Sequence, residues 1–85
     1  MKKFSYGITD ELGIHARPAG MLVKKANEFE SNITLDKAGK TASAKRIMAV
    51  MGLGVKQGEE ITVTVEGPDE EAAAIAVEAF LKENL

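Results

Sequence analysis

The segment EITVTVE, residues 60–66, places the strongest constraint on the fold of this chain. Ile61, Val63 and Val65 alternate with threonine and glutamate, which is typical of a strand with one buried face. The sequence GPDEE follows directly. Proline and glycine favour a turn, and Asp69 followed by two glutamates indicates a helix that starts there with Asp69 as its N-cap. The chain therefore changes from strand to helix within a few residues.

The rest of the chain shows the same two hydrophobic periods. Alternation in KKFSYGIT at the N-terminus predicts a first strand, and NITLD followed by KAGK predicts a hairpin whose second strand lies near residues 40–42. Apolar residues at helical spacing predict one helix from Ala16 and another from Asp69 towards the C-terminus. A third, shorter helix is predicted in AKRIMAVMGLG. The expected order is strand, helix, two strands, helix, strand, helix.

Composition excludes several classes of protein. The 85 residues suffice for one domain with a single core, so we expect one domain over residues 1–85. Eleven basic and 13 acidic side chains give a net charge of −2 without a basic run, which argues against a nucleic-acid partner. No segment approaches the roughly 20 apolar residues of a membrane span, so no membrane insertion is expected. With no cysteine and one histidine, we expect no metal site and no cofactor.

The single histidine lies in GIHARPAG, residues 13–20. Pro18 is favourable only in the first turn of a helix, so His15 is expected just ahead of that turn. Free N–H groups and the positive end of the helix dipole make such a position an anion site. A lone histidine at such a junction is commonly only a surface or capping residue. Arg17 favours the functional interpretation, because a cation there is unfavourable for the resting helix but well matched to phosphate.

The short helix predicted in AKRIMAVMGLG is apolar around about half its circumference. Ile47, Met48, Val50 and Met51 all lie within about two turns. Two interpretations remain open. Either the helix is buried in the core with methionines filling gaps, or some of these side chains are exposed as an adaptable docking patch. Gly52 or Gly54 is expected to end the helix in a left-handed conformation.

The motifs GIHARPA and KTASAKRIMAVMGLGV, at their distance from one another, resemble those of the histidine-containing phosphocarrier proteins, the HPr family of the bacterial phosphoenolpyruvate-dependent sugar phosphotransferase system. The similarity covers essentially all 85 residues. It implies an α+β fold of order βαββαβα. This is an open-faced β-sandwich in which a four-stranded antiparallel sheet, in the spatial order 1-4-2-3, carries three helices on one face.

The resemblance also implies a function. His15 would accept a phosphoryl group on Nδ1 from phosphorylated enzyme I and pass it to sugar-specific enzyme IIA components during sugar uptake. Arg17 would be its electrostatic partner, and the backbone N–H groups of Ala16 and Arg17 would bind the phosphate. The protein would be a cytoplasmic monomer that transfers phosphoryl groups without being a free-standing enzyme.

The partner interface that the resemblance implies lies on the two helices next to His15. It consists of Leu12, Gly20, Met21, Lys24, Asn27, Arg46, Ile47, Met48, Met51 and Lys56. Two positions depart from the family pattern. Leu12 stands where many relatives have a small polar residue, and Arg46 stands where regulated relatives carry a serine. We therefore expect no regulatory serine and no regulation by a serine kinase.

A second function from another class is an HPr-like regulatory module that binds a transcription factor or a metabolic enzyme. Known relatives of that kind tend to lack the active histidine. The presence of His15 therefore favours the phosphocarrier.

Overall fold

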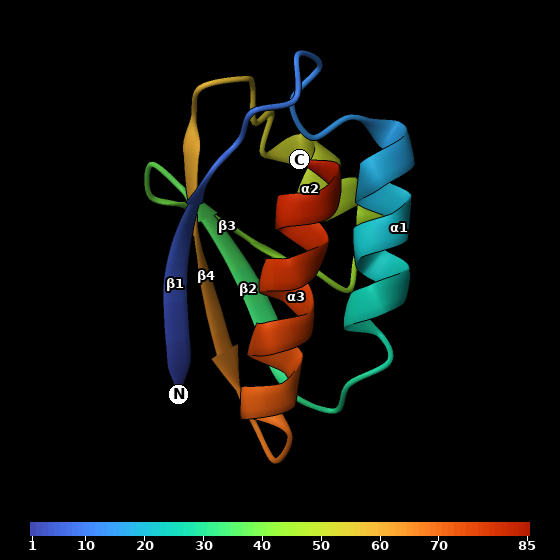
Figure 1. Cartoon of the computed structure of the whole chain (residues 1–85), viewed down its shortest axis with the longest axis vertical. Helices are drawn as coiled ribbons and strands as arrows, with labels where there is room; N and C mark the ends of the chain where they lie inside the picture. The colour runs from blue at the N-terminus through green and yellow to red at the C-terminus, as the bar shows by residue number, and fades with distance from the viewer.

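The computed structural model describes all residues from 1 to 85. It contains seven elements in the predicted order (Figure 1). They are β1 (Lys2–Gly7), α1 (Ala16–Ala26), β2 (Asn32–Lys37), β3 (Lys40–Ser43), α2 (Ile47–Gly52), β4 (Glu60–Glu66) and α3 (Glu70–Asn84). None of the three helices combines the length and the apolar character needed to cross a membrane.

The four strands form one antiparallel sheet in the order β1-β4-β2-β3. The segment that gave the clearest strand signal is therefore an inner strand. Val63 of β4 pairs with Phe4 of β1 on one side and with Leu35 of β2 on the other. The predicted hairpin is confirmed, since β2 and β3 pair through Lys37 and Lys40. This is the open-faced sandwich that the family resemblance implied.

Burial is confined to one face of the sheet. Ile61, Val63 and Val65 are fully buried, whereas the threonines between them are only half-buried. All three helices lie on the same side of the sheet (Figure 1). Since the apolar side chains of each strand point to that side, strands and helices share one core of 20 buried hydrophobic residues.

The three helices lie where the sequence predicted them, but the hydrogen bonds of the Asp69 side chain differ from those of an ordinary N-cap. Asp69 is the N-cap residue of α3, as predicted, yet its side chain makes no capping hydrogen bond. Its carboxylate instead accepts hydrogen bonds from the backbone N–H groups of Glu30 and Ser31, both at 2.9 Å, and from the Ser31 hydroxyl at 2.5 Å. The Asp69 carboxylate therefore bonds to the fully buried Ser31, which is distant in sequence, and not to the N–H groups of its own helix.

The structure excludes the interpretation in which α2 is buried in the core. Only Val50 is buried on this helix. The helix ends at Gly52, and Gly54 follows with a φ of 61°, so the predicted left-handed residue is confirmed at the second of the two glycines. The remaining large side chains of α2 are therefore free to form a surface.

Candidate functional site

The position of His15 is set by the residues that precede it. Gly13 has a φ of 66°, and a side chain there would collide with the carbonyl oxygen of Val55. The same oxygen accepts a hydrogen bond from the N–H of Ile14 at 3.1 Å. Only glycine permits this close approach at a positive φ. The contact fixes the backbone of the loop directly ahead of α1.

His15 is the N-cap residue of α1. Its backbone is extended, its carbonyl accepts the first helical hydrogen bond from Ala19 at 3.0 Å, and its ring makes no capping hydrogen bond. The N–H groups of Ala16 and Arg17 donate no hydrogen bond within the chain, and Pro18 has no N–H to donate. The first turn contains no acidic residue. This helix end therefore has free N–H donors and no carboxylate within its first turn, which favours the binding of an anion.

A pocket of about 230 Å³ lies beside the imidazole. Its lining consists of Asp10, His15, Arg17, Pro18, Met21 and Asn84. The predicted pair of His15 and Arg17 is thus brought together at one pocket, and the His15 side chain remains 35% exposed. A protein partner can therefore reach the ring directly.

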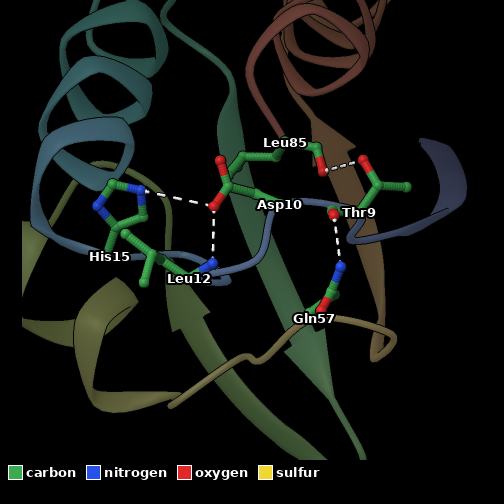
Figure 2. Close-up of polar contacts among 6 residues, drawn as sticks. All are labelled: Thr9, Asp10, Leu12, His15, Gln57 and Leu85. Carbon is green, nitrogen blue, oxygen red and sulfur yellow. Dashed lines mark hydrogen bonds and ion pairs between the residues drawn. The ribbon is translucent and has the colours of Figure 1, made fainter.

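Two residues of this pocket were not identified from the sequence. Asp10 places Oδ1 3.8 Å from Nε2 of His15 (Figure 2). A carboxylate five residues before the only histidine was the one available signal. Asn84 comes from the last turn of α3 and reaches the pocket because that end of α3 lies at the same end of the molecule as the start of α1 (Figure 1). Nothing local in the sequence indicated this.

The exposed apolar side chains of α2 support the docking interpretation. Met48 is 77% exposed, while Ile47 and Met51 are about 40% exposed. Cδ1 of Ile47 lies 3.6 Å from the position a side chain would occupy at Gly20. Gly20 is thus half-buried where α1 and α2 meet. The two helices are therefore close together here, next to the exposed apolar side chains of α2.

The loop before His15 and the outer face of α1 extend this surface. Leu12 is 71% exposed and Met21 is 44% exposed. Lys24 and Lys56 are also exposed. The backbone of Lys56 runs against Gly13, so its basic side chain starts close to the histidine loop.

The remaining two predicted interface residues lie at the far end of α1. The Asn27 side-chain amide donates to the carbonyl oxygens of Val23 at 2.9 Å and Lys45 at 3.3 Å. This places Arg46, the exposed N-cap residue of α2, beside the end of α1 that is opposite His15. An 11-residue helix is about 16 Å long. Arg46 is therefore well separated from the pocket.

Comparison with known proteins agrees with this geometry. A family model described as "PTS HPr component phosphorylation site" matches residues 2–83. The histidine-containing phosphocarrier protein of a mycoplasma is 43% identical, with a TM-score of 0.94, and the match covers 96% of this chain and 93% of that one. The phosphocarrier protein HPr of Bacillus anthracis is 39% identical, with a TM-score of 0.88 and coverage of 94% and 95%.

The Bacillus subtilis protein Crh, described as a catabolite repression protein and as a swapped dimer, is also similar. It is 36% identical over 100% of this chain and 98% of its own, with a TM-score of 0.79. The fold and the exposed histidine at a helix N-terminus define a carrier of phosphoryl groups. The chain belongs to the HPr family of phosphocarrier proteins of the phosphotransferase system.

Proposed function

We propose that His15 accepts a phosphoryl group on Nδ1 from phosphorylated enzyme I and passes it to enzyme IIA proteins or domains during sugar uptake. The observation that carries this proposal is the open N-terminus of α1, where the ring is accessible and two N–H groups are unused. The only polar contact of the ring is through Nε2. Nδ1 is therefore the nitrogen available to a donor (Figure 2).

The transfer requires no further co-reactant. The electron pair of Nδ1 attacks phosphorus and forms the N–P bond, while the bond from phosphorus to the donor breaks and its electron pair stays on the donor. The reverse reaction with an acceptor returns His15 to its free state. Histidine suits this relay because the neutral ring is a nucleophile and its phosphoramidate bond is readily given up.

Arg17 and the start of α1 stabilise the phosphorylated form. The exposed guanidinium lines the same pocket as His15 and is able to make charge-assisted hydrogen bonds to phosphate. The N–H groups of Ala16 and Arg17 supply two further donors. These interactions form only when the phosphoryl group is present, so they favour transfer to His15.

We propose that Leu12, Met21, Ile47, Met48 and Met51 form the centre of the surface that partners contact, with Lys24 and Lys56 attracting acidic surfaces. Met48→Asp places a charge where an apolar contact is expected. Because Met48 is 77% exposed, the fold should be unaffected, whereas binding of enzyme I should weaken by about 1–3 kcal/mol. Calorimetric titration measures the loss. Unchanged binding would remove Met48 from the interface.

We further propose that residues 1–85 act as one carrier domain, as a monomer in the cytoplasm, without regulation by a serine kinase. The support for a monomer is that the apolar surface beside His15 must remain free for successive partners. Some related proteins are described as dimers, so the oligomeric state has to be measured. Sedimentation equilibrium should give the mass of a monomer.

The test of the main proposal is incubation with enzyme I and phosphoenolpyruvate, followed by mass spectrometry. The expected product carries one phosphoryl group that is labile in acid and stable in base. His15→Ala should keep its circular dichroism spectrum and gain no phosphate. A phosphorylated His15→Ala protein would refute the assignment. Absence of phosphate on the unaltered protein would favour the regulatory binding module.

A further inference from the structure

We propose that Asp10 is a positioning residue for His15. Its carboxylate holds the proton of the neutral imidazole on Nε2, so that Nδ1 presents its electron pair to phosphorus. This inference rests on the proposed phosphoryl transfer through Nδ1. It assigns a role to a residue in the loop before α1, five positions ahead of His15.

The first observation is the direction of the contact. Oδ1 of Asp10 lies 3.8 Å from Nε2 of His15, and Figure 2 shows the second ring nitrogen facing away from the carboxylate. This distance is longer than a hydrogen bond, but contacts of this kind commonly shorten only in the reacting complex. Both side chains are about one-third exposed. The interaction is therefore electrostatic and partly shielded from water.

The second observation is that the carboxylate is held in place. Its Oδ1 accepts a hydrogen bond from the N–H of Leu12 at 2.8 Å. The carbonyl of Asp10 accepts one from Gly13 at 2.9 Å, and its N–H donates to the carbonyl of Leu85 at 3.1 Å. Hydrogen bonds thus hold both the side chain and the backbone of Asp10 in place.

The loop is also attached to the rest of the molecule (Figure 2). The N–H and the hydroxyl of Thr9 donate to the carbonyl of Leu85 at 2.6 and 2.9 Å, and the Gln57 amide donates to the carbonyl of Thr9 at 3.1 Å. Leu85 is itself buried in the core. A carboxylate on a loop with these attachments keeps its place beside the ring.

A carboxylate only accepts hydrogen bonds. The tautomer with hydrogen on Nε2 is attracted to Asp10, whereas an unprotonated Nε2 would turn its electron pair towards a negative charge. The partner of one ring nitrogen therefore determines the state of the other. When Nδ1 forms the bond to phosphorus, the proton stays on Nε2 and the ring gains positive charge, which Asp10 stabilises. Leu12, between Asp10 and His15, has no side-chain group able to replace this contact.

The experiment measures the His15 tautomer directly, by ¹⁵N NMR of the ring nitrogens at a pH where the ring is neutral. Asp10→Asn removes the charge but keeps an oxygen for the N–H of Leu12, so the loop is preserved. The ratio of the Nε2–H to the Nδ1–H tautomer should fall roughly two- to fivefold, as expected for a partly exposed charge contact. The rate of phosphoryl acceptance from enzyme I should fall by a comparable factor.

The matched control is Glu11→Gln, which makes the same change in charge at the neighbouring, exposed residue and should leave both the tautomer ratio and the rate unchanged. A wild-type tautomer ratio in Asp10→Asn would overturn the proposal, as would an equal effect of Glu11→Gln, which would indicate only a general field of the loop. The NMR readout needs no phosphorylation. Failure of the proposed carrier function would therefore appear separately, as unaltered protein that takes up no phosphate.

Discussion

The N-termini of α1 and α3 differ in the charges that surround the positive end of the helix dipole. At α3, Asp69 is the N-cap and Glu70 and Glu71 occupy the first turn. Glu70 also accepts a hydrogen bond from the N–H of Gly67 at 3.2 Å and pairs with the amino group of Met1 at 2.6 Å. Negative charge close to a helix N-terminus stabilises the helix. This end of α3 is satisfied by the protein itself.

The N-terminus of α1 has none of these features. His15 makes no capping bond, the first turn has no acidic residue, and Arg17 adds a positive charge. An arrangement that does not stabilise the resting helix is favourable once an anion arrives. The same helix dipole therefore stabilises α3, where the protein's own carboxylates interact with it, and favours anion binding at α1, where no side chain caps the helix.

The two carboxyl groups at the N-terminus of α3 have lowered pKa values. Hydrogen bonds from the Ser31 hydroxyl and the Glu30 N–H lower the pKa of Asp69. The amino group of Met1 and the N–H of Gly67 lower the pKa of Glu70. Both groups are thus held in the charged form beside the helix start.

The largest expected effect comes from making α1 resemble α3. Arg17→Glu removes the phosphate partner and places a carboxylate in the first turn, where it repels the incoming phosphoryl group. The rate of phosphoryl acceptance from enzyme I should fall by at least about a hundredfold, while the free energy of unfolding should change by less than about 1 kcal/mol. Quench-flow transfer assays and urea denaturation measure the two quantities. Arg17→Lys is the control, which retains the charge but not the paired donors and should lose less. A normal rate in Arg17→Glu would show that α1 needs no cation.

A smaller effect is expected when a hydrogen bond at the N-terminus of α3 is removed. Ser31→Ala removes the buried hydroxyl that donates to Asp69, and should lower the free energy of unfolding by about 1–2 kcal/mol. Phosphoryl transfer should be unchanged because the pocket does not include Ser31. Ser5→Ala, at an exposed hydroxyl, is the control and should stay within about 0.5 kcal/mol of the wild type. Equal stability of the two variants would contradict the account of α3.

The stability lost in Ser31→Ala should depend on pH, and the direction follows from the lowered pKa of Asp69. Because its folded-state pKa lies below the ordinary value of 3.8, its stabilising contribution is fully present above that value. The contribution is lost as the pH falls through the lower, folded-state pKa. The difference in stability between the wild type and Ser31→Ala should therefore be constant near neutrality and shrink in acid. Urea denaturation at a series of pH values checks this. A difference that grows in acid would show that another group dominates.

The smallest effect concerns α2, whose N-terminus resembles that of α1. Its N-cap is Arg46, without a side-chain capping bond and without acidic residues in the first turn. Arg46→Ser supplies a capping oxygen and should raise the free energy of unfolding by about 0.5–1 kcal/mol, whereas Arg46→Ala should not. Thermal denaturation compares the two variants.

Arg46→Ser also tests the expected absence of serine regulation. With an ATP-dependent HPr kinase, this variant should gain acid-stable phosphate and the unaltered protein none. The nearest hydroxyl, Ser43, lies at the end of β3 and accepts a hydrogen bond from the N–H of Lys45 at 3.2 Å. Stoichiometric phosphoserine there in the unaltered protein would contradict the expectation.

Features that depend only on neighbouring residues could be predicted from the amino-acid sequence. The alternation in β4, the start of α1 at Ala16 and a left-handed glycine at Gly52 or Gly54 were predicted correctly, because a few consecutive residues decide each of them. His15 and Arg17 became candidates for the same reason, since the donors at a helix N-terminus belong to adjacent residues. The order of the strands came only from the family resemblance.

The tertiary structure decided which groups from distant parts of the chain meet. It turned the Asp69 carboxylate from its own helix to Ser31, and it brought Asn84 and Asp10 to the pocket of His15. It also left Met48 exposed and buried Val50, two residues away on the same short helix. Local patterns contain no information on these points, because the partner of a polar group and the exposure of an apolar one depend on how the helices pack on the sheet.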